Sequence, residues 1–225
     1  MNLRGKIVNF LGDSITEGVG VETCLDKRYD NIIKEKCGLK NAYNYRISGT
    51  SIAYQMTPSE EPSWDLYFCG RVCLMNKEAD VIVVYGGVND YTHGDAPFGK
   101  MGDTTPETYC GAVDFLMKKL NELYPNAAKV FMTPARMQYE NMNDEKPSPR
   151  EMKYSDAKPL TDYGRIIKET AGKYNIKVLD LYEKLPINPN IVADKEKYTI
   201  DGLHFNAEGH KVLADTLINF IENEM

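Results

Sequence analysis

Five short runs of apolar and β-branched residues alternate with longer segments of helical periodicity along nearly the whole of a 225-residue chain. Gly, Pro, Asn or Asp bound each run, as is common for strands; the runs are Lys6–Leu11, Ala42–Ile47, Val81–Tyr85, Lys129–Thr133 and Lys177–Asp180. Helical spacing predicts helices at Tyr29–Lys36, Leu66–Asn76, Pro106–Leu123, Thr161–Tyr174 and Ala207–Glu222. Strict alternation favours parallel strands joined by right-handed crossovers. The sequence therefore predicts one α/β domain over residues 1–225, a three-layer α/β/α sandwich around a five-stranded parallel sheet.

The overall charge and hydropathy exclude several classes of protein. The net charge is -6 at pH 7 and no block rich in Lys and Arg is present, which argues against nucleic-acid binding. No segment approaches the ~18 consecutive apolar residues of a membrane span, and Met1–Leu11 holds too short an apolar run for a signal-peptide core. We therefore expect a cytoplasmic protein, although a secreted one whose signal peptide had been removed would look the same.

The chain has five cysteines, an odd number that argues against a disulfide scaffold and favours reduced thiols. Cys69 and Cys73 are four residues apart and would share one face of a helix. Metal ligation would need further Cys or His residues at suitable spacing, and none lies close by in the sequence. We therefore expect small core residues at these positions and no metal site.

The first predicted strand ends in Gly12-Asp13-Ser14, which places a serine hydroxyl on a tight turn at the edge of the sheet. A glycine-rich turn between a strand and a helix also suits a phosphate site, or a serine that only caps the helix. The spacing of Gly12, Gly18 and Gly20 fits neither a P-loop nor a dinucleotide-binding fingerprint. Ser14 is therefore a candidate nucleophile, provided that a base lies near it.

A candidate base lies far downstream, where Asp201-Gly202-Leu203-His204 directly precedes the last predicted helix. A carboxylate three residues before a histidine can hold its Nδ1 and leave Nε2 free as a base. A purely local hydrogen bond at the start of a helix is the alternative interpretation. His93, in a polar segment, and His210, one turn into a helix, are expected to be solvated or structural.

Two further strand ends carry groups that can hold a negatively charged oxygen. Asn89, in Gly86-Gly87-Val88-Asn89-Asp90, offers a side-chain amide, and Gly49, in Ser48-Gly49-Thr50, offers a backbone N–H without a Cβ in the way. Either residue alone is typical of a turn. Together with Ser14 they lie at the carboxyl edge of the predicted sheet, where open α/β sheets bind ligands.

These four segments, in this order and at this wide spacing, resemble the SGNH (GDSL-type) hydrolase family, which is named for its Ser, Gly, Asn and His residues. Gly12-Asp13-Ser14 resembles the first block, Ser48-Gly49 the second, Gly87-Val88-Asn89-Asp90 the third and Asp201-Gly202-Leu203-His204 the last. The second block departs from the family pattern, because Arg46 stands where the family often has a glycine.

The resemblance implies a serine esterase with a flavodoxin-like sheet order of 2-1-3-4-5, needing no metal and no cofactor. Ser14 would attack the ester carbonyl, His204 would act as base, and Asp201 would hold His204. The oxyanion would be held by the backbone N–H groups of Ser14 and Gly49 and by the amide of Asn89. The alternatives are a non-catalytic binding module on the same fold and a flavodoxin-like nucleotide or flavin binder.

Two long segments without regular structure, Tyr91–Thr105 and Pro134–Pro159, are expected to follow strands and to form walls of the site or mobile surface loops. They are rich in charged residues, Gly and Pro, and their apolar side chains are scattered. A long acyl chain would need a continuous apolar channel. We therefore expect a small-molecule ester with a short acyl group on a polar alcohol, such as an O-acetylated sugar, with a lysophospholipid or thioester as the alternative.

Overall fold

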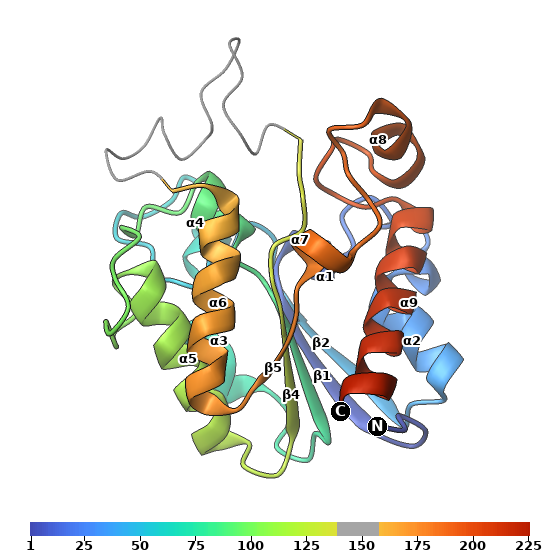
Figure 1. Ribbon diagram of the computed structural model, residues 1–225, viewed down its shortest axis with the longest axis horizontal. Helices are drawn as coiled ribbons and strands as arrows, with labels where there is room; N and C mark the ends of the chain where they lie inside the picture. The colour runs from blue at the N-terminus through green and yellow to red at the C-terminus, as the bar shows by residue number, and fades with distance from the viewer. Residues whose placement is uncertain (139–157) are drawn as a thin grey trace.

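The computed structural model describes residues 1–138 and 158–225 and contains one parallel sheet (Figure 1). Its strands are β1 (Ile7–Gly12), β2 (Asn41–Arg46), β3 (Val81–Tyr85), β4 (Ala128–Met132) and β5 (Lys177–Leu179). They lie in the order β2-β1-β3-β4-β5, and every neighbouring pair is parallel. The predicted five-stranded sheet and its order 2-1-3-4-5 are confirmed.

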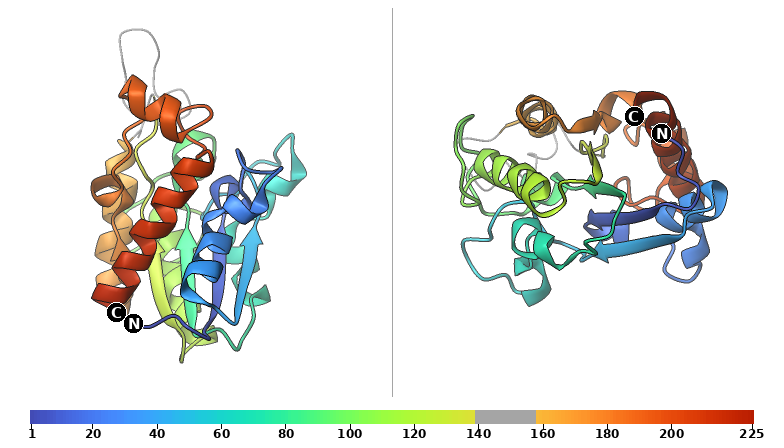
Figure 2. Two further views of the ribbon diagram at one scale, coloured as in Figure 1. Left: turned by 90° about the vertical axis from the view of Figure 1, so that its right-hand side faces the viewer. Right: turned by 90° about the horizontal axis from the view of Figure 1, so that it is seen from below.

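Helices cover both faces of the sheet, which gives the three predicted layers (Figures 1 and 2). One face carries α2 (Tyr29–Cys37) and α9 (Ala207–Glu224), and the other carries α3 (Phe68–Arg71), α5 (Tyr109–Leu123) and α6 (Leu160–Tyr174). All residues of β3 are buried, with Ile82 and Val84 in one hydrophobic cluster and Val81, Val83 and Tyr85 in the other. Burial on both faces explains why this strand is continuously apolar rather than alternating.

The predicted helix at Leu66–Asn76 is wrong in extent. A 3-10 helix at Pro62–Asp65, the four-residue helix α3 and a second 3-10 helix at Val72–Leu74 take its place. Gly70 weakens helical continuity, and Arg71 is buried although it is charged, so the segment does not have one apolar face. Cys69 is buried but Cys73 is exposed, which corrects the expectation that both are core residues.

Four short helices were not predicted: α1 (Ser14–Glu17), α4 (Val88–Thr92), α7 (Leu181–Lys184) and α8 (Val192–Tyr198). The segment Tyr91–Thr105 therefore begins inside α4. The predicted start of α5 at Pro106 is three residues early, because Thr108 caps this helix by accepting from the N–H of Gly111 at 3.1 Å.

Of the predicted wall Pro134–Pro159, residues 139–157 lie outside the described residues. None of the described helices is long and apolar enough to cross a membrane.

Candidate active site

Ser14 is the first residue of α1, directly beyond β1, and its side chain is almost completely buried. The helix starts there because the Asp13 carboxylate accepts a hydrogen bond from the N–H of Ile15 at 3.1 Å. A Cβ on Gly12 would lie 1.9 Å from Thr16 Oγ1, so only glycine allows this strand to turn so tightly into the helix. The turn places the Ser14 hydroxyl at the carboxyl edge of the sheet.

The structure brings the three predicted catalytic side chains together in one hydrogen-bonded chain. His204 Nε2 lies 2.9 Å from Ser14 Oγ, and His204 Nδ1 lies 2.6 Å from Asp201 Oδ2. Burial alone would raise the pKa of Asp201, but hydrogen bonds from the His204 ring and from the His204 and Leu203 N–H groups hold this pKa below its ordinary value. Asp201 is therefore a carboxylate at neutral pH and suits a histidine with its proton on Nδ1.

A tight turn before α9 makes this arrangement possible. Gly202 occupies the left-handed region with φ +88°, and the N–H of Ile200 donates to the carbonyl of His204 at 2.9 Å. Directly after the turn, Asn206 caps α9 by accepting from the N–H groups of Glu208 and Gly209. The turn thus places Asp201 and His204 beside Ser14, which is 190 residues from His204 in the sequence.

Gly49 and Asn89 lie at the same edge of the sheet as Ser14. Gly12 is in register with Arg46 of β2 and with Tyr85 of β3, so the residues that follow these strand ends are neighbours. The Asn89 amide donates to the carbonyl of Thr50 at 3.0 Å, which links the segment after β3 to the residue next to Gly49.

Two aromatic residues contact these positions and were not recognised as site residues from the sequence. The Trp64 indole packs on Gly49, since a Cβ there would lie 2.1 Å from Trp64 Nε1. The Trp64 and His93 rings are 4.5 Å apart between centroids, and His93 Nε2 lies 3.2 Å from Asn89 Oδ1. The four-residue spacing of Asn89 and His93 would have placed both on one helical face. No comparable signal marks Trp64.

His210 has a structural position. It is fully buried, stacked against Tyr29 with ring centroids 6.0 Å apart, and near Phe205 at 6.1 Å. Burial lowers the pKa of His210 to about 4, so the ring is neutral at physiological pH. Both ring nitrogens lack a hydrogen-bond partner among the described residues.

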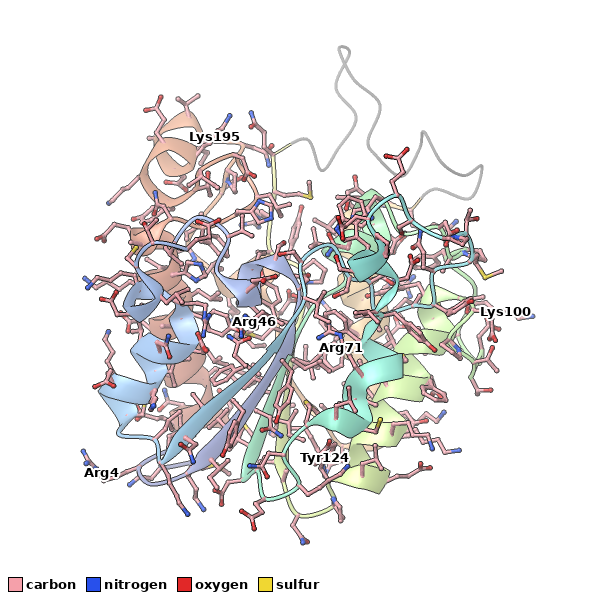
Figure 3. All side chains as sticks on the ribbon, turned by 180° about the vertical axis from the view of Figure 1, so that it is seen from behind. Arg4, Arg46, Arg71, Lys100, Tyr124 and Lys195 are labelled. Atoms are coloured by element: carbon pink, nitrogen blue, oxygen red, sulfur yellow. The ribbon has the colours of Figure 1, made fainter. Side chains whose placement is uncertain are left out.

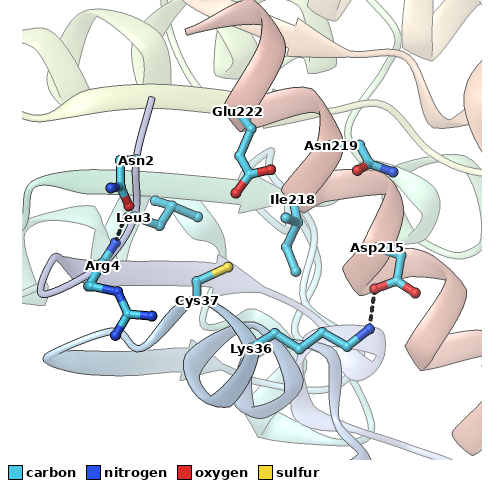
Figure 4. A pocket seen from close by; sticks show the side chains of 9 residues that line it. All are labelled: Asn2, Leu3, Arg4, Lys36, Cys37, Asp215, Ile218, Asn219 and Glu222. Atoms are coloured by element: carbon cyan, nitrogen blue, oxygen red, sulfur yellow. Dashed lines mark hydrogen bonds and ion pairs between the residues drawn. The ribbon is translucent and has the colours of Figure 1, made fainter.

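A pocket of about 470 Å³ at the opposite edge of the sheet is unrelated to this site (Figure 4). An ion pair between Lys36 and Asp215 lies at its rim. The described residues that line the pocket include neither a serine nor a histidine. Over residues 1–138 and 158–225, no group of three or more His, Cys, Asp or Glu residues is arranged to hold a metal ion.

The chain is similar to known proteins in sequence and in fold. The sequence profile of the GDSL-like Lipase/Acylhydrolase family matches residues 10–212. A crystal structure of a protein from Lactobacillus plantarum is similar over 99% of both chains, with 28% identity and a TM-score of 0.82. A search of curated proteins gave no match.

More distant structures share the fold. An acetyl xylan esterase is 22% identical over 96% of this chain and 99% of its own, with a TM-score of 0.62. A carbohydrate acetylesterase from Sinorhizobium meliloti is 13% identical over 98% of this chain and 100% of its own, with a TM-score of 0.69.

Proposed function

Because the chain belongs to the GDSL-like lipase/acylhydrolase family, a family of ester hydrolases, we propose that it is a serine esterase with Ser14 as nucleophile. His204 is the base and Asp201 orients it. The observation that carries this proposal is the continuous chain from Ser14 Oγ through the His204 ring to the Asp201 carboxylate, with separations of 2.9 and 2.6 Å.

The reaction follows from the direction of these hydrogen bonds. With its proton on Nδ1 and held by Asp201, His204 accepts the Ser14 proton at Nε2 while Ser14 Oγ attacks the ester carbonyl carbon. The tetrahedral intermediate expels the alcohol, which takes the proton from His204. A water molecule then attacks the acyl group on Ser14, with His204 again as base, and releases the acid.

The oxyanion is stabilised by three donors, the N–H groups of Ser14 and Gly49 and the side-chain amide of Asn89. Among the described residues, neither backbone N–H has another acceptor. Asn89 donates one amide hydrogen to Thr50 and retains a second, and the contact of Asn89 Oδ1 with His93 fixes which way the amide faces. Each of the three groups thus keeps a hydrogen that an oxyanion could accept.

The substrate is a small acyl ester of a polar alcohol, and we take an O-acetylated sugar as the reference compound. A pocket of about 490 Å³ adjoins Gly49 and Asn89 through Trp64 and His93 and is otherwise lined by Gln55, Ser59, Glu60 and Glu61. One aromatic face among polar side chains suits a hydroxyl-rich ring better than an alkyl chain. Two structural neighbours that act on acetylated carbohydrates point to the same class.

The direct test is hydrolysis of 4-nitrophenyl acetate by the wild-type protein and by Ser14→Ala. The wild type should turn over the ester, and the variant should lose on the order of 10⁶ in kcat while it unfolds at the wild-type temperature. A folded Ser14→Ala protein that keeps a tenth of the wild-type rate would exclude Ser14 as nucleophile. A wild type without turnover of any ester would favour the binding-module alternative.

A further inference from the structure

Arg71, the last residue of α3, lies beneath the carboxyl ends of the strands (Figure 3), and its side chain is 8% exposed. Its Nε donates to the carbonyl of Leu66 at 2.9 Å, and its Nη1 donates to that of Tyr45 at 2.5 Å. Its Nη2 donates to the carbonyl of Gly12 at 3.0 Å and to Thr50 Oγ1 at 2.7 Å. One guanidinium group therefore connects the ends of β1 and β2 with the segment that follows β2.

These contacts lead to each of the three proposed oxyanion donors. Gly12 is two residues before Ser14, and Thr50 directly follows Gly49. The carbonyl of Thr50 in turn accepts the Asn89 amide at 3.0 Å. A displacement of the Arg71 guanidinium would thus change the relative positions of all three donor segments.

The positive charge of Arg71 is not neutralised by contact. Its four acceptors are uncharged oxygens, and in the part of the chain that the structure describes it forms no ion pair. The guanidinium also lies 4.6 Å from the centre of the Phe68 ring. Burial lowers the pKa of Arg71 to about 10, with Asp13 and Glu17 opposing this change from a longer range, so the group stays protonated at neutral pH.

A buried cation that is hydrogen-bonded but has no counter-ion lowers the stability of the fold, because its charge is removed from water. We therefore expect the charge of Arg71 to have a role in the chemistry of the site. Where water is excluded, a fixed positive charge stabilises a nearby negative charge more strongly than it would in water. The charge on the carbonyl oxygen is larger in the transition state than in the bound ester, so such a group would raise kcat more than it would lower KM.

We propose that Arg71 is a positioning residue of the oxyanion hole, which holds the segments of Ser14, Gly49 and Asn89 together and places a buried positive charge behind them. The inference rests on the proposed esterase function. A lysine cannot replace Arg71 fully, because its single ammonium group lacks the planar fork that reaches three chain segments at once.

The test compares Arg71→Met and Arg71→Lys with a matched control, Arg4→Met, at an exposed arginine on the opposite edge of the sheet (Figure 3). We expect Arg71→Met to lower kcat for 4-nitrophenyl acetate by on the order of 10², with KM nearly unchanged. Arg71→Lys should fall between Arg71→Met and the wild type, because it retains the charge. Arg4→Met should match the wild type.

Rescue separates this role from a purely structural one. In Arg71→Ala, millimolar guanidinium or methylguanidinium ion should restore part of kcat, scored per reactive serine titrated with a fluorophosphonate. Loss of folded protein alone would lower the number of titratable serines but not kcat for each of them, and guanidinium would not raise kcat.

Two results would overturn this inference but not the proposed function. The first is a folded Arg71→Met protein with kcat within about threefold of wild type. The second is a set of Arg71 variants that guanidinium does not rescue and whose activity falls only in proportion to the number of titratable serines. A wild type that hydrolyses no ester overturns the proposed function, and this inference with it. The wild-type measurement therefore distinguishes the two failures.

Discussion

Asp201 accepts three hydrogen bonds within its own turn, from the backbone N–H groups of Leu203 and His204 at 2.9 and 2.7 Å and from the His204 ring at 2.6 Å. In Asp201→Asn the side-chain oxygen can keep the two backbone bonds, while the amide NH₂ then faces Nδ1. His204 would be forced to carry its proton on Nε2, where it cannot accept one from Ser14.

We therefore expect Asp201→Asn to lose up to ~10⁴ in kcat with an almost unchanged unfolding temperature. Steady-state kinetics and thermal unfolding check this, with Asp26→Asn on the surface as control. A variant that retains wild-type kcat would show that Asp201 does not orient the base.

His210 gives stability a pH dependence at the scale of one residue. Its pKa is about 4 in the folded protein against an ordinary 6.5, so the unfolded chain binds a proton first as the pH falls. The contribution of the neutral His210 ring to the free energy of unfolding is complete above about pH 6.5. It is lost progressively down to about pH 4, by roughly 3 kcal/mol in total.

His210→Phe should remove this dependence, and urea unfolding at pH 7, 5.5 and 4 measures it. The difference between the two proteins isolates His210, because burial raises the pKa of Asp13 to about 6 and gives an opposite contribution over an overlapping range. Parallel curves for both proteins would contradict the prediction.

At the scale of elements, the contact between the segment after β2 and the 3-10 helix at Pro62–Asp65 shapes the site. Gly49 has φ +74° and also lies against Trp64. Gly49→Ala should therefore lower the free energy of unfolding by roughly 1–2 kcal/mol because of the backbone conformation alone. The overlap of the new Cβ with the Trp64 indole should lower it further.

A double-mutant cycle separates the two effects. In the Gly49→Ala background, Trp64→Ala should restore only the part of the free energy of unfolding that was lost to the overlap with the indole. Gly5→Ala is the matched control, because Gly5 has φ +73° and nothing within 4 Å of an added Cβ. Equal losses for both glycine variants, with no coupling to Trp64, would exclude the packing argument.

At the scale of the whole molecule, the two chain ends lie together at the amino edge of the sheet, away from α1 (Figure 1). The amino group of Met1 donates to the carbonyl of Ile221 at 2.8 Å. The carboxyl edge is thus left to the site and to the pocket beside Trp64.

The lining of this pocket, in which the Trp64 and His93 rings alternate with polar and acidic side chains and none of the described residues is aliphatic, predicts a preference for short acyl groups and polar alcohols. In a series of 4-nitrophenyl esters from acetate to decanoate, kept below any micelle threshold, kcat/KM should be highest for the shortest chains. Each added CH₂ gains ~0.8 kcal/mol only where it is buried from water. A steady rise with chain length would instead favour a lipid-directed acylhydrolase.

The sequence by itself determined the alternation of strands and helices and the edge of the sheet at which the candidate site lies, whereas the sheet order 2-1-3-4-5 was implied only by the resemblance to the family. Parallel strands end at one edge, so residues directly after β1, β2 and β3 had to become neighbours wherever the strands paired. Asp201 and His204 were also predictable as a pair, because residues three positions apart can meet across a tight turn. The positions of the strands could be read from the short apolar runs, because the pattern within each run does not depend on contacts with distant segments.

The tertiary structure alone decided which other side chains complete the site. Trp64 contacts Gly49, and Arg71 bonds to Gly12, Tyr45 and Thr50, through pairings of segments that no local period encodes. The same contacts explain the error at Leu66–Asn76, where a charged residue is buried and the helix is broken into short pieces. The cost of burying an arginine there is reduced only because the ends of β1 and β2 and the residue Leu66 supply carbonyl oxygens at once, and those oxygens converge only after the sheet has formed.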